Sequence, residues 1–202
     1  MIIDFNDVNG TQAYHLLTQT VIPRPVAWIL TENESGNYNL APYSFFTAIC
    51  STPPIVMFSV GKKPSGEVKD TRRNIERTQE FVIHIAGMDL ANDMTESSRT
   101  LDYGVSEVDH SNLALNTDWP SSLPRLEQCQ VAMHCVLHKV DEIGDNKQGV
   151  VYGEVKHMYL SESVIKTSER LQVNAVGVDP IARLGGSEYA GLGSVITISR
   201  PE

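Results

Sequence analysis

Residues 24–30 read Arg-Pro-Val-Ala-Trp-Ile-Leu, residues 39–46 read Asn-Leu-Ala-Pro-Tyr-Ser-Phe-Phe, and residues 53–60 read Pro-Pro-Ile-Val-Met-Phe-Ser-Val. These apolar runs are separated by turns rich in proline, glycine, asparagine and serine, a pattern typical of strands joined by hairpins. The first run has Val26, Trp28 and Leu30 at alternate positions, so a strand would place them on one face. This part of the chain therefore predicts an antiparallel sheet.

The rest of the chain continues the pattern with few helices. Residues 32–37 form a strong hairpin-turn signal, and Pro42 predicts a break or bulge in the returning strand. Apolar periodicity and turn signals predict helices over 71–78 and 90–99, and strands over 81–86, 128–140 and 149–160. Strands and helices do not alternate regularly, which disfavours a parallel α/β sheet. The pattern instead indicates a mainly β fold, an antiparallel barrel with helical insertions.

Length and charge limit the possible functions. The chain has 202 residues, which predicts a single domain over 1–202 with a real hydrophobic core. Its formal net charge of −9 argues against nucleic acid or an anionic membrane as the main partner. A local cationic cleft for a phosphate remains compatible with that charge, because net charge does not describe one cleft.

Cysteine usage and the N-terminus indicate a cytoplasmic protein. The N-terminus lacks a basic region followed by a long apolar segment, so we expect no signal peptide, and no apolar run reaches transmembrane length. The cysteines are Cys50, Cys129 and Cys135, an odd number without a CxxC pair, so no disulfide framework is expected. Cys50 and Cys135 lie in apolar runs and are expected to be buried, inert thiols.

Lys69-Asp70-Thr71 supplies phosphate-binding chemistry at the start of a predicted helix. The first N–H groups of a helix lack intrahelical partners and attract anions. Asp70 is the expected N-cap. A simple capped helix with a solvated basic first turn is the alternative, and taken alone it is the commoner case. Arg72 and Arg73 oppose the helix dipole in that first turn, which suggests a nearby anion.

Residues 39–46 are the second candidate site. Ser44 and Thr47 offer hydroxyl groups, and the backbone around Ala41 and Tyr43 could meet the edge of a planar ligand. The alternative is a bulged strand whose aromatic side chains fill the core. Ser59 offers another hydroxyl at a strand end, whereas Trp28, a lone aromatic residue in a strand, is more often a core residue.

Other motifs are incomplete, so we expect neither a metal site nor a catalytic nucleophile. Gly61 and Gly66 have P-loop spacing, but Glu67-Val68 follow where Lys and Ser or Thr should stand. No GxGxxG follows a strand. His134 and His138 lie four residues apart, but in a segment that alternates as a strand and lacks the glutamate of an HExxH site.

In their order and spacing, these segments resemble the flavin reductase-like, FMN-binding split-barrel family, which includes flavoredoxin. The resemblance is carried by residues 24–28, 39–46, 53–59, 69–75 and 80–85, and by Arg183-Leu184-Gly185-Gly186-x2-Tyr189. It implies a six-stranded antiparallel Greek-key split β-barrel, usually a homodimer, with FMN (or FAD) at a barrel rim near the subunit interface.

By the same resemblance, the implied cofactor-binding residues are Asn39, Ala41, Ser44, Phe45, Ser59, Lys69, Asp70 and Thr71, with Arg24, Asn74 and Arg183 in a second rank. Asp70 has the alternative role of a cap that orders its loop. No side chain need act as nucleophile, because the flavin itself carries the redox chemistry.

The implied activity is NAD(P)H-dependent flavin reduction, in which hydride passes from the nicotinamide to the flavin. The electrons would then go to free flavin, a monooxygenase partner, an electron-transfer protein or oxygen. One alternative is an FMN-binding electron carrier like flavoredoxin, without its own nicotinamide site. Another is a split barrel that has lost flavin and serves as a binding domain.

Overall fold

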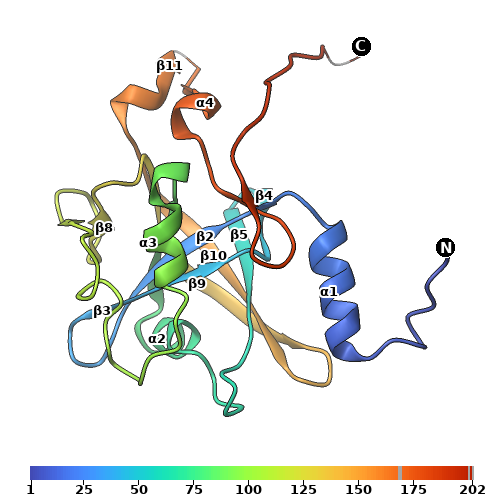
Figure 1. Ribbon diagram of the computed structural model, residues 1–202. Coiled ribbons are helices and arrows are strands. Elements are labelled where there is room, and N and C mark those ends of the chain that lie inside the picture. The colour runs from blue at the N-terminus through green and yellow to red at the C-terminus, as the bar shows by residue number, and fades with distance from the viewer. Residues whose placement is uncertain (168–169, 200, 202) are drawn as a thin grey trace.

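The computed structural model describes residues 1–167, 170–199 and 201 (Figure 1). Its helices are short and consist of α1 (Gly10–Thr20), α2 (Asp70–Thr78), η1 (Met88–Leu90), α3 (Ala91–Glu96), η2 (Glu162–Val164) and α4 (Ala175–Val178). The strands are β1 (Arg24–Pro25), β2 (Ala27–Glu32), β3 (Tyr38–Tyr43), β4 (Phe46–Ser51), β5 (Pro54–Val60), β6 (Glu80–Ile85), β7 (Leu115–Asn116), β8 (Arg125–Leu126), β9 (Val131–Ile143), β10 (Gln148–Leu160), β11 (Ile165–Thr167), β12 (Gln172–Val173), β13 (Ala182–Arg183) and β14 (Tyr189–Ala190). None of the described helices is long and apolar enough to cross a membrane.

The main sheet has seven strands in the order β3-β2-β6-β9-β10-β5-β4, and every pairing in it is antiparallel. The two edge strands, β3 and β4, are joined directly by Ser44 and Phe45. A flat sheet of this width would separate its edges by roughly 29 Å, whereas so short a link spans at most about 11 Å. The sheet must therefore curl until its edges approach each other at this link.

The prediction of a mainly β, antiparallel fold with few helices is confirmed. The barrel is not closed, because no ladder among the described residues pairs β3 with β4. The sheet also has seven strands where the family resemblance implied six. The six-stranded split barrel therefore stays a prediction.

Both faces of the curled sheet are buried. On the inner face, Ala27 and Ile29 pack with Phe58, Phe81 and other apolar side chains, and Ile75 of α2 closes this cluster. On the outer face, Val26, Trp28 and Leu30 pack in a second cluster with residues of α3 and the loops before β9. The predicted alternation in this strand is confirmed, as is the core position of Trp28, which is fully buried.

Several local predictions need correction. The second helix is Ala91–Glu96, preceded by a short 3-10 turn, rather than 90–99. Cys135 is buried as expected, but Cys50 is exposed because β4 is an edge strand whose side chains lie mostly on the surface. Helix α1, which lies to one side of the sheet in Figure 1, was not predicted. Its local signal was a capping box, in which Asn9 and Gln12 bond each other's backbone N–H groups.

Candidate functional site

The N-terminus of α2 is left without a side-chain cap. The N-cap residue is Lys69, and no side chain among the described residues bonds the free N–H groups of this helix. The prediction that Asp70 is the N-cap is wrong, since Asp70 is the first helical residue. Its carboxylate lies 2.7 Å from Lys63 Nζ instead of folding back onto the helix. The first turn of α2 therefore offers open N–H donors and the positive end of the helix dipole.

Lys69 adds a cation that no carboxylate of the described residues neutralises. It is partly buried, and the salt bridges of the described residues include Lys63 with Asp70 but none with Lys69. Its Nζ lies 5.7 Å from the centroid of the Tyr43 ring. Burial, together with the nearby Lys63, lowers the pKa of Lys69. An anion placed between Lys69 and the helix N-terminus would relieve this unfavourable burial of charge.

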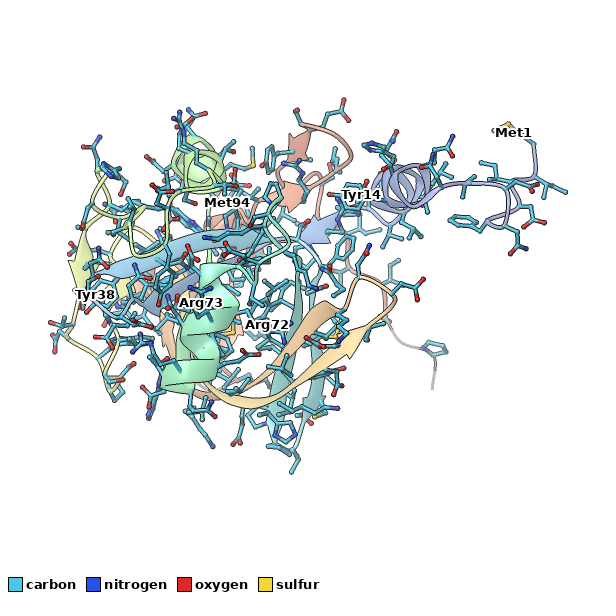
Figure 2. All side chains as sticks on the ribbon, turned by 90° about the horizontal axis from the view of Figure 1, so that it is seen from below. Met1, Tyr14, Tyr38, Arg72, Arg73 and Met94 are labelled. Atoms are coloured by element: carbon cyan, nitrogen blue, oxygen red, sulfur yellow. The ribbon has the colours of Figure 1, made fainter. Side chains whose placement is uncertain are left out.

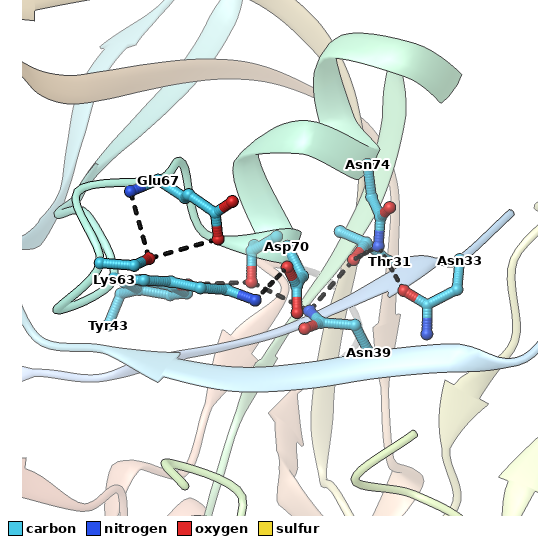
Figure 3. A network of polar contacts seen from close by, with 10 residues as sticks. Thr31, Asn33, Asn39, Tyr43, Lys63, Glu67, Asp70 and Asn74 are labelled. Atoms are coloured by element: carbon cyan, nitrogen blue, oxygen red, sulfur yellow. Dashed lines mark hydrogen bonds and ion pairs between the residues drawn. The ribbon is translucent and has the colours of Figure 1, made fainter. Parts of the chain in front are cut away.

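Thr71 is fixed so that its hydroxyl proton has no acceptor among the described side chains. Asn39 Nδ2 donates to Thr71 Oγ1 at 2.9 Å, and Tyr43 Oη donates to the same oxygen at 2.8 Å. Figure 3 shows this network beside the Lys63–Asp70 pair. Because a hydroxyl oxygen has two lone pairs, both are used, and its proton is left to donate to a ligand. Thr71 is 1% exposed, so bulk water reaches it poorly.

These groups surround a small cavity of about 60 Å³, which we name the α2 cavity. It is lined by Asn39, Ala41, Pro42, Tyr43, Lys63, Lys69, Asp70, Thr71, Ser97, Ser98, Arg99, Thr100, Leu101 and Glu107. Five of the residues proposed from the sequence, Asn39, Ala41, Lys69, Asp70 and Thr71, thus meet in one place. They come from β3 and α2, which the curl of the sheet brings together.

Glu107 is a member of this cavity that the sequence did not indicate. It lies in the loop before β7, where no periodic pattern marked it. Its Oε2 accepts a hydrogen bond of 2.9 Å from the backbone N–H of Leu40 on edge strand β3. Burial, with a further contribution from Asp70, raises the pKa of Glu107 to about 7, although the Leu40 N–H and Lys63 act in the opposite direction.

A second, larger cavity of about 320 Å³ adjoins the first, and we name it the α1 cavity. It is lined by Tyr14, His15, Thr18, Arg24, Val26, Pro42, Ser44, Met94, Ser98, Arg183, Leu184, Gly186 and Tyr189. Pro42 and Ser98 line both cavities, so the two are neighbours, and we refer to them together as the cleft. Three further sequence candidates, Arg24, Ser44 and Arg183, lie in this half.

The remaining candidates line neither half of the cleft. Asn74 is a buried residue of α2, and its Nδ2 donates to Thr31 Oγ1 at 3.1 Å and to Asn33 Oδ1 at 2.7 Å. Ser59 Oγ accepts from Gln148 Nε2 at 2.8 Å. Phe45 is 40% exposed at the link between β3 and β4. Their roles at a cofactor stay predictions.

The anion expected beside Arg72 is supplied by the protein itself. Its guanidinium lies 2.8 Å from carboxylate oxygens of both Glu76 and Glu142. Arg73 instead stacks on the Tyr103 ring, 4.5 Å from its centroid. Arg72 and Arg73 therefore do not indicate a bound anion. Lys69, for which the described residues provide no carboxylate partner, does indicate one.

The α2 cavity fits a phosphate group. Within the part of the chain that the structure describes, it offers helix N–H groups without a side-chain cap, a cation without a carboxylate partner and a hydroxyl proton without an acceptor. Such donors bind phosphate in proteins. The cleft then continues past Pro42 into a half with apolar and aromatic walls, the environment that a planar ring system prefers.

Comparisons with known proteins identify the family to which this chain is similar. The family model described as Flavin reductase like domain matches residues 19–172. The crystal structure of nitrilotriacetate monooxygenase component B from Bacillus cereus is 31% identical, with a TM-score of 0.90 and 98% of each chain covered. The 2-nitrobenzoate 2-nitroreductase NbaA of Pseudomonas fluorescens is 28% identical, with a TM-score of 0.87 and coverage of 100% of this chain and 96% of that chain. The uncharacterised protein YwrF of Bacillus subtilis (strain 168) is 32% identical over 205 residues, which cover 99% of this chain and 98% of the relative.

Proposed function

The chain belongs to the flavin reductase like domain family, and on that premise we propose that it is an FMN-binding oxidoreductase that passes hydride from NAD(P)H to flavin. The observation that carries the proposal is the uncapped N-terminus of α2, with Lys69 and the Thr71 hydroxyl beside it. This donor set suits the terminal phosphate of FMN, and FAD remains the second choice of flavin.

We assign the residues of the cleft by their chemistry. Lys69, Thr71 and the first N–H groups of α2 would hold the phosphate. Asn39 positions the Thr71 hydroxyl through a hydrogen bond, and Asp70 holds Lys63 at the cavity through an ion pair. Two residues would contact the flavin ring: Ala41, which lies within β3, and Ser44, which follows the end of β3. Phe45 and Ser59 remain proposed cofactor contacts, and Arg24, Asn74 and Arg183 remain candidates of second rank.

A bound flavin supplies hydride and electron transfer, so the protein needs no nucleophile of its own. The protein's part is to orient the ring along the edge of β3 and to exclude water from one side of it. Lys69 and the α2 dipole also make the cleft locally positive, although the chain carries a net charge of −9. A positive environment favours anionic forms of a bound cofactor.

The proposal includes the wider context of the protein. We propose a single domain over residues 1–202, a cytoplasmic location and a homodimer. Strand β4 is an edge strand of the main sheet, and its residue Ile49 is an exposed apolar side chain. An exposed apolar edge of this kind supports self-association. Because component B of a monooxygenase is among the similar structures, a monooxygenase or another electron-transfer protein is the proposed electron-accepting partner.

The visible absorbance of the purified protein, recorded anaerobically before and after NADH or NADPH is added, tests the proposal. Flavin bands that bleach on addition of either nicotinamide support a reductase. Bands that persist indicate an electron carrier like flavoredoxin, which a partner protein would reduce. If the protein is colourless and also fails to bind added FMN, the proposal is wrong and a binding domain without flavin becomes the better description.

A further inference from the structure

A third cavity, which we name the hairpin cavity, adjoins the α1 cavity and has no part in the flavin site described above. Its volume is about 410 Å³. Its walls come from α1 and the segment after it, and from the turn between β13 and β14; the lining residues are His15, Gln19, Ile22, Leu184, Gly185, Gly186, Ser187 and Glu188. His15, Leu184 and Gly186 also line the α1 cavity, so the two cavities are neighbours.

The turn that forms one wall of the hairpin cavity is held by hydrogen bonds and by packing. Leu184 N–H donates to the carbonyl of Glu188, and Glu188 N–H donates to the carbonyl of Gly185, each at 3.0 Å. A Cβ atom at Gly185 would collide with Gln19 of α1, the helix on which Figure 2 labels Tyr14. The turn therefore lies directly against α1, and the backbone of Glu188 has a defined position at the cavity.

The two cavities carry charges of opposite sign. Arg183 lines the α1 cavity and donates to the carbonyl of Gly186, which lines both cavities. The salt bridges of the described residues include none with Arg183 or with Arg24, the second arginine of the α1 cavity. The described walls of the hairpin cavity contain no lysine or arginine, and Glu188 is their one carboxylate.

This arrangement follows the parts of a dinucleotide in order. A nicotinamide must contact the flavin ring to pass hydride to it, and the ring is assigned to the α1 cavity. The rest of the donor must then lie in adjoining space. The α2 cavity, of about 60 Å³, is already assigned to the flavin phosphate. The hairpin cavity is the larger neighbour, and a pyrophosphate that enters it would pass the border at which Arg183 lies.

We propose that the hairpin cavity holds the adenosine ribose of the nicotinamide donor, and that Glu188 makes NADH the preferred donor over NADPH. A carboxylate can accept hydrogen bonds from the ribose hydroxyls. The 2′-phosphate of NADPH would instead lie beside this negative charge, with no cation among the described wall residues. Glu188 is thus a specificity-determining residue that takes no part in hydride transfer. The inference rests on the proposed function, since it takes the flavin ring to lie in the α1 cavity.

The first test measures binding without redox chemistry. FMN-saturated protein is titrated in phosphate-free buffer, by isothermal titration calorimetry, with ADP-ribose and separately with ADP-ribose 2′-phosphate. These two compounds differ only in the phosphate that distinguishes NADPH from NADH. The wild type should bind ADP-ribose about tenfold or more tightly than its 2′-phosphate. E188Q should reduce this preference because an amide carries no charge, and E188R should reverse it because arginine accommodates a 2′-phosphate.

The second test is anaerobic stopped-flow reduction of the bound flavin by NADH and by NADPH. The Glu188 variants should act mainly on the donor concentration that gives half-maximal reduction, rather than on the limiting rate, because Glu188 contacts the donor far from its reacting atoms. E127Q is the matched control. Glu127 is an exposed glutamate that lines neither cavity, so this variant should keep the wild-type preference in both tests.

Three results would overturn the inference: failure of ADP-ribose to bind, equal or tighter binding of its 2′-phosphate by the wild type, and a preference that E188R leaves unchanged. Failure of the proposed function looks different. Neither nicotinamide would then bleach the flavin bands, or FMN would not bind at all, while the same titration, on apoprotein if necessary, still reports on the hairpin cavity. Reduction by NADPH as readily as by NADH would keep the proposed function and remove Glu188 as its selector.

Discussion

Lys69 and Glu107 are ionisable side chains of opposite type that line the same cavity. Burial lowers the pKa of Lys69 and raises that of Glu107 to about 7. Both shifts have the same origin, since each group loses contact with water. The salt bridges of the described residues include no pair between Lys69 and Glu107. We therefore make a separate prediction for each side chain, on FMN affinity for Lys69 and on the pH dependence of stability for Glu107.

Replacement of Lys69 by methionine should weaken FMN binding by about tenfold or more, because a hydrogen bond to a charged group contributes roughly 1.5–3 kcal/mol. Flavin fluorescence quenching gives the dissociation constant. Lys62→Met is the matched control, since Lys62 is an exposed lysine in the same loop that does not line the cavity. Equal affinities for the two variants would remove Lys69 from the phosphate site.

Glu107 should make the protein less stable as the pH rises. Its pKa of about 7 in the folded protein exceeds the ordinary value for glutamate, so the folded state holds a proton that the unfolded chain has released. The free energy of unfolding should therefore fall between about pH 4.5 and 7, by on the order of 1–3 kcal/mol, and stay low above that window.

Urea denaturation at pH 5 and pH 8 measures this effect. Glu107→Gln cannot ionise, and its amide oxygen can still accept from Leu40 N–H, so this variant should be more stable than wild type at pH 8. Glu127→Gln, at an exposed carboxylate, should retain the wild-type pH dependence. If Glu107→Gln and wild type show the same slope with pH, the carboxyl of Glu107 is not the group that titrates.

At the scale of elements, the sequence predicted those structures whose signals are local. The turn at 32–37 joins β2 and β3 as expected, and α2 begins one residue before the predicted start. Helix α1 was missed although its capping box, Asn9 and Gln12, is a local signal, and in the structure its apolar side chains such as Tyr14 and Leu17 are exposed. The N-cap of α2 was misassigned because the partner of Asp70, Lys63, lies in the preceding loop and no local rule pairs them.

Strand β10 contains a glycine on whose small size the inner core depends. A Cβ atom at Gly153 would lie 2.3 Å from Cζ of the buried Phe81 ring and 3.3 Å from Cβ of Cys135. A register shift between Tyr152 and Gly153 marks the same point as a bend in the ladder with β9. The ladder thus bends at the point where the Phe81 ring packs against the backbone of Gly153, which has no side chain.

Gly153→Ala should therefore destabilise the protein by about 1–3 kcal/mol through overpacking. Chemical denaturation followed by tryptophan fluorescence measures the loss, and Gly10→Ala serves as control. A Cβ at Gly10, the first residue of α1, meets nothing within 4 Å, so that change should be neutral or slightly stabilising. A Gly153→Ala protein as stable as wild type would mean that Phe81 can move without cost.

At the scale of the whole molecule, the site is a product of topology. The sequence identified Lys69-Asp70-Thr71 and the segment 39–44 separately, each from its own chemistry. Their meeting depends on the crossover that places α2 against β2 and β3, which no local pattern encodes. Glu107 enters the cleft from a loop without periodicity, so sequence reasoning had no means to find it. The same topology turns the side chain of Asn74, a buried residue of α2, toward Thr31 and Asn33, to which it donates hydrogen bonds.

The last prediction concerns the free edge of the curled sheet. Among the strands that the structure describes, β4 pairs with β5 alone, and all its residues after Phe46 are exposed, including Ile49 at 49%. Exposed apolar edge strands are surfaces on which a second chain can pair or pack. Size-exclusion chromatography with light scattering should therefore find a dimer for the wild type and a monomer for Ile49→Glu. Ile143→Glu introduces the same charge at an isoleucine that is 57% exposed, at the end of β9, and should remain dimeric. A monomeric wild type, or a dimer that survives Ile49→Glu, would place the subunit interface elsewhere or remove it.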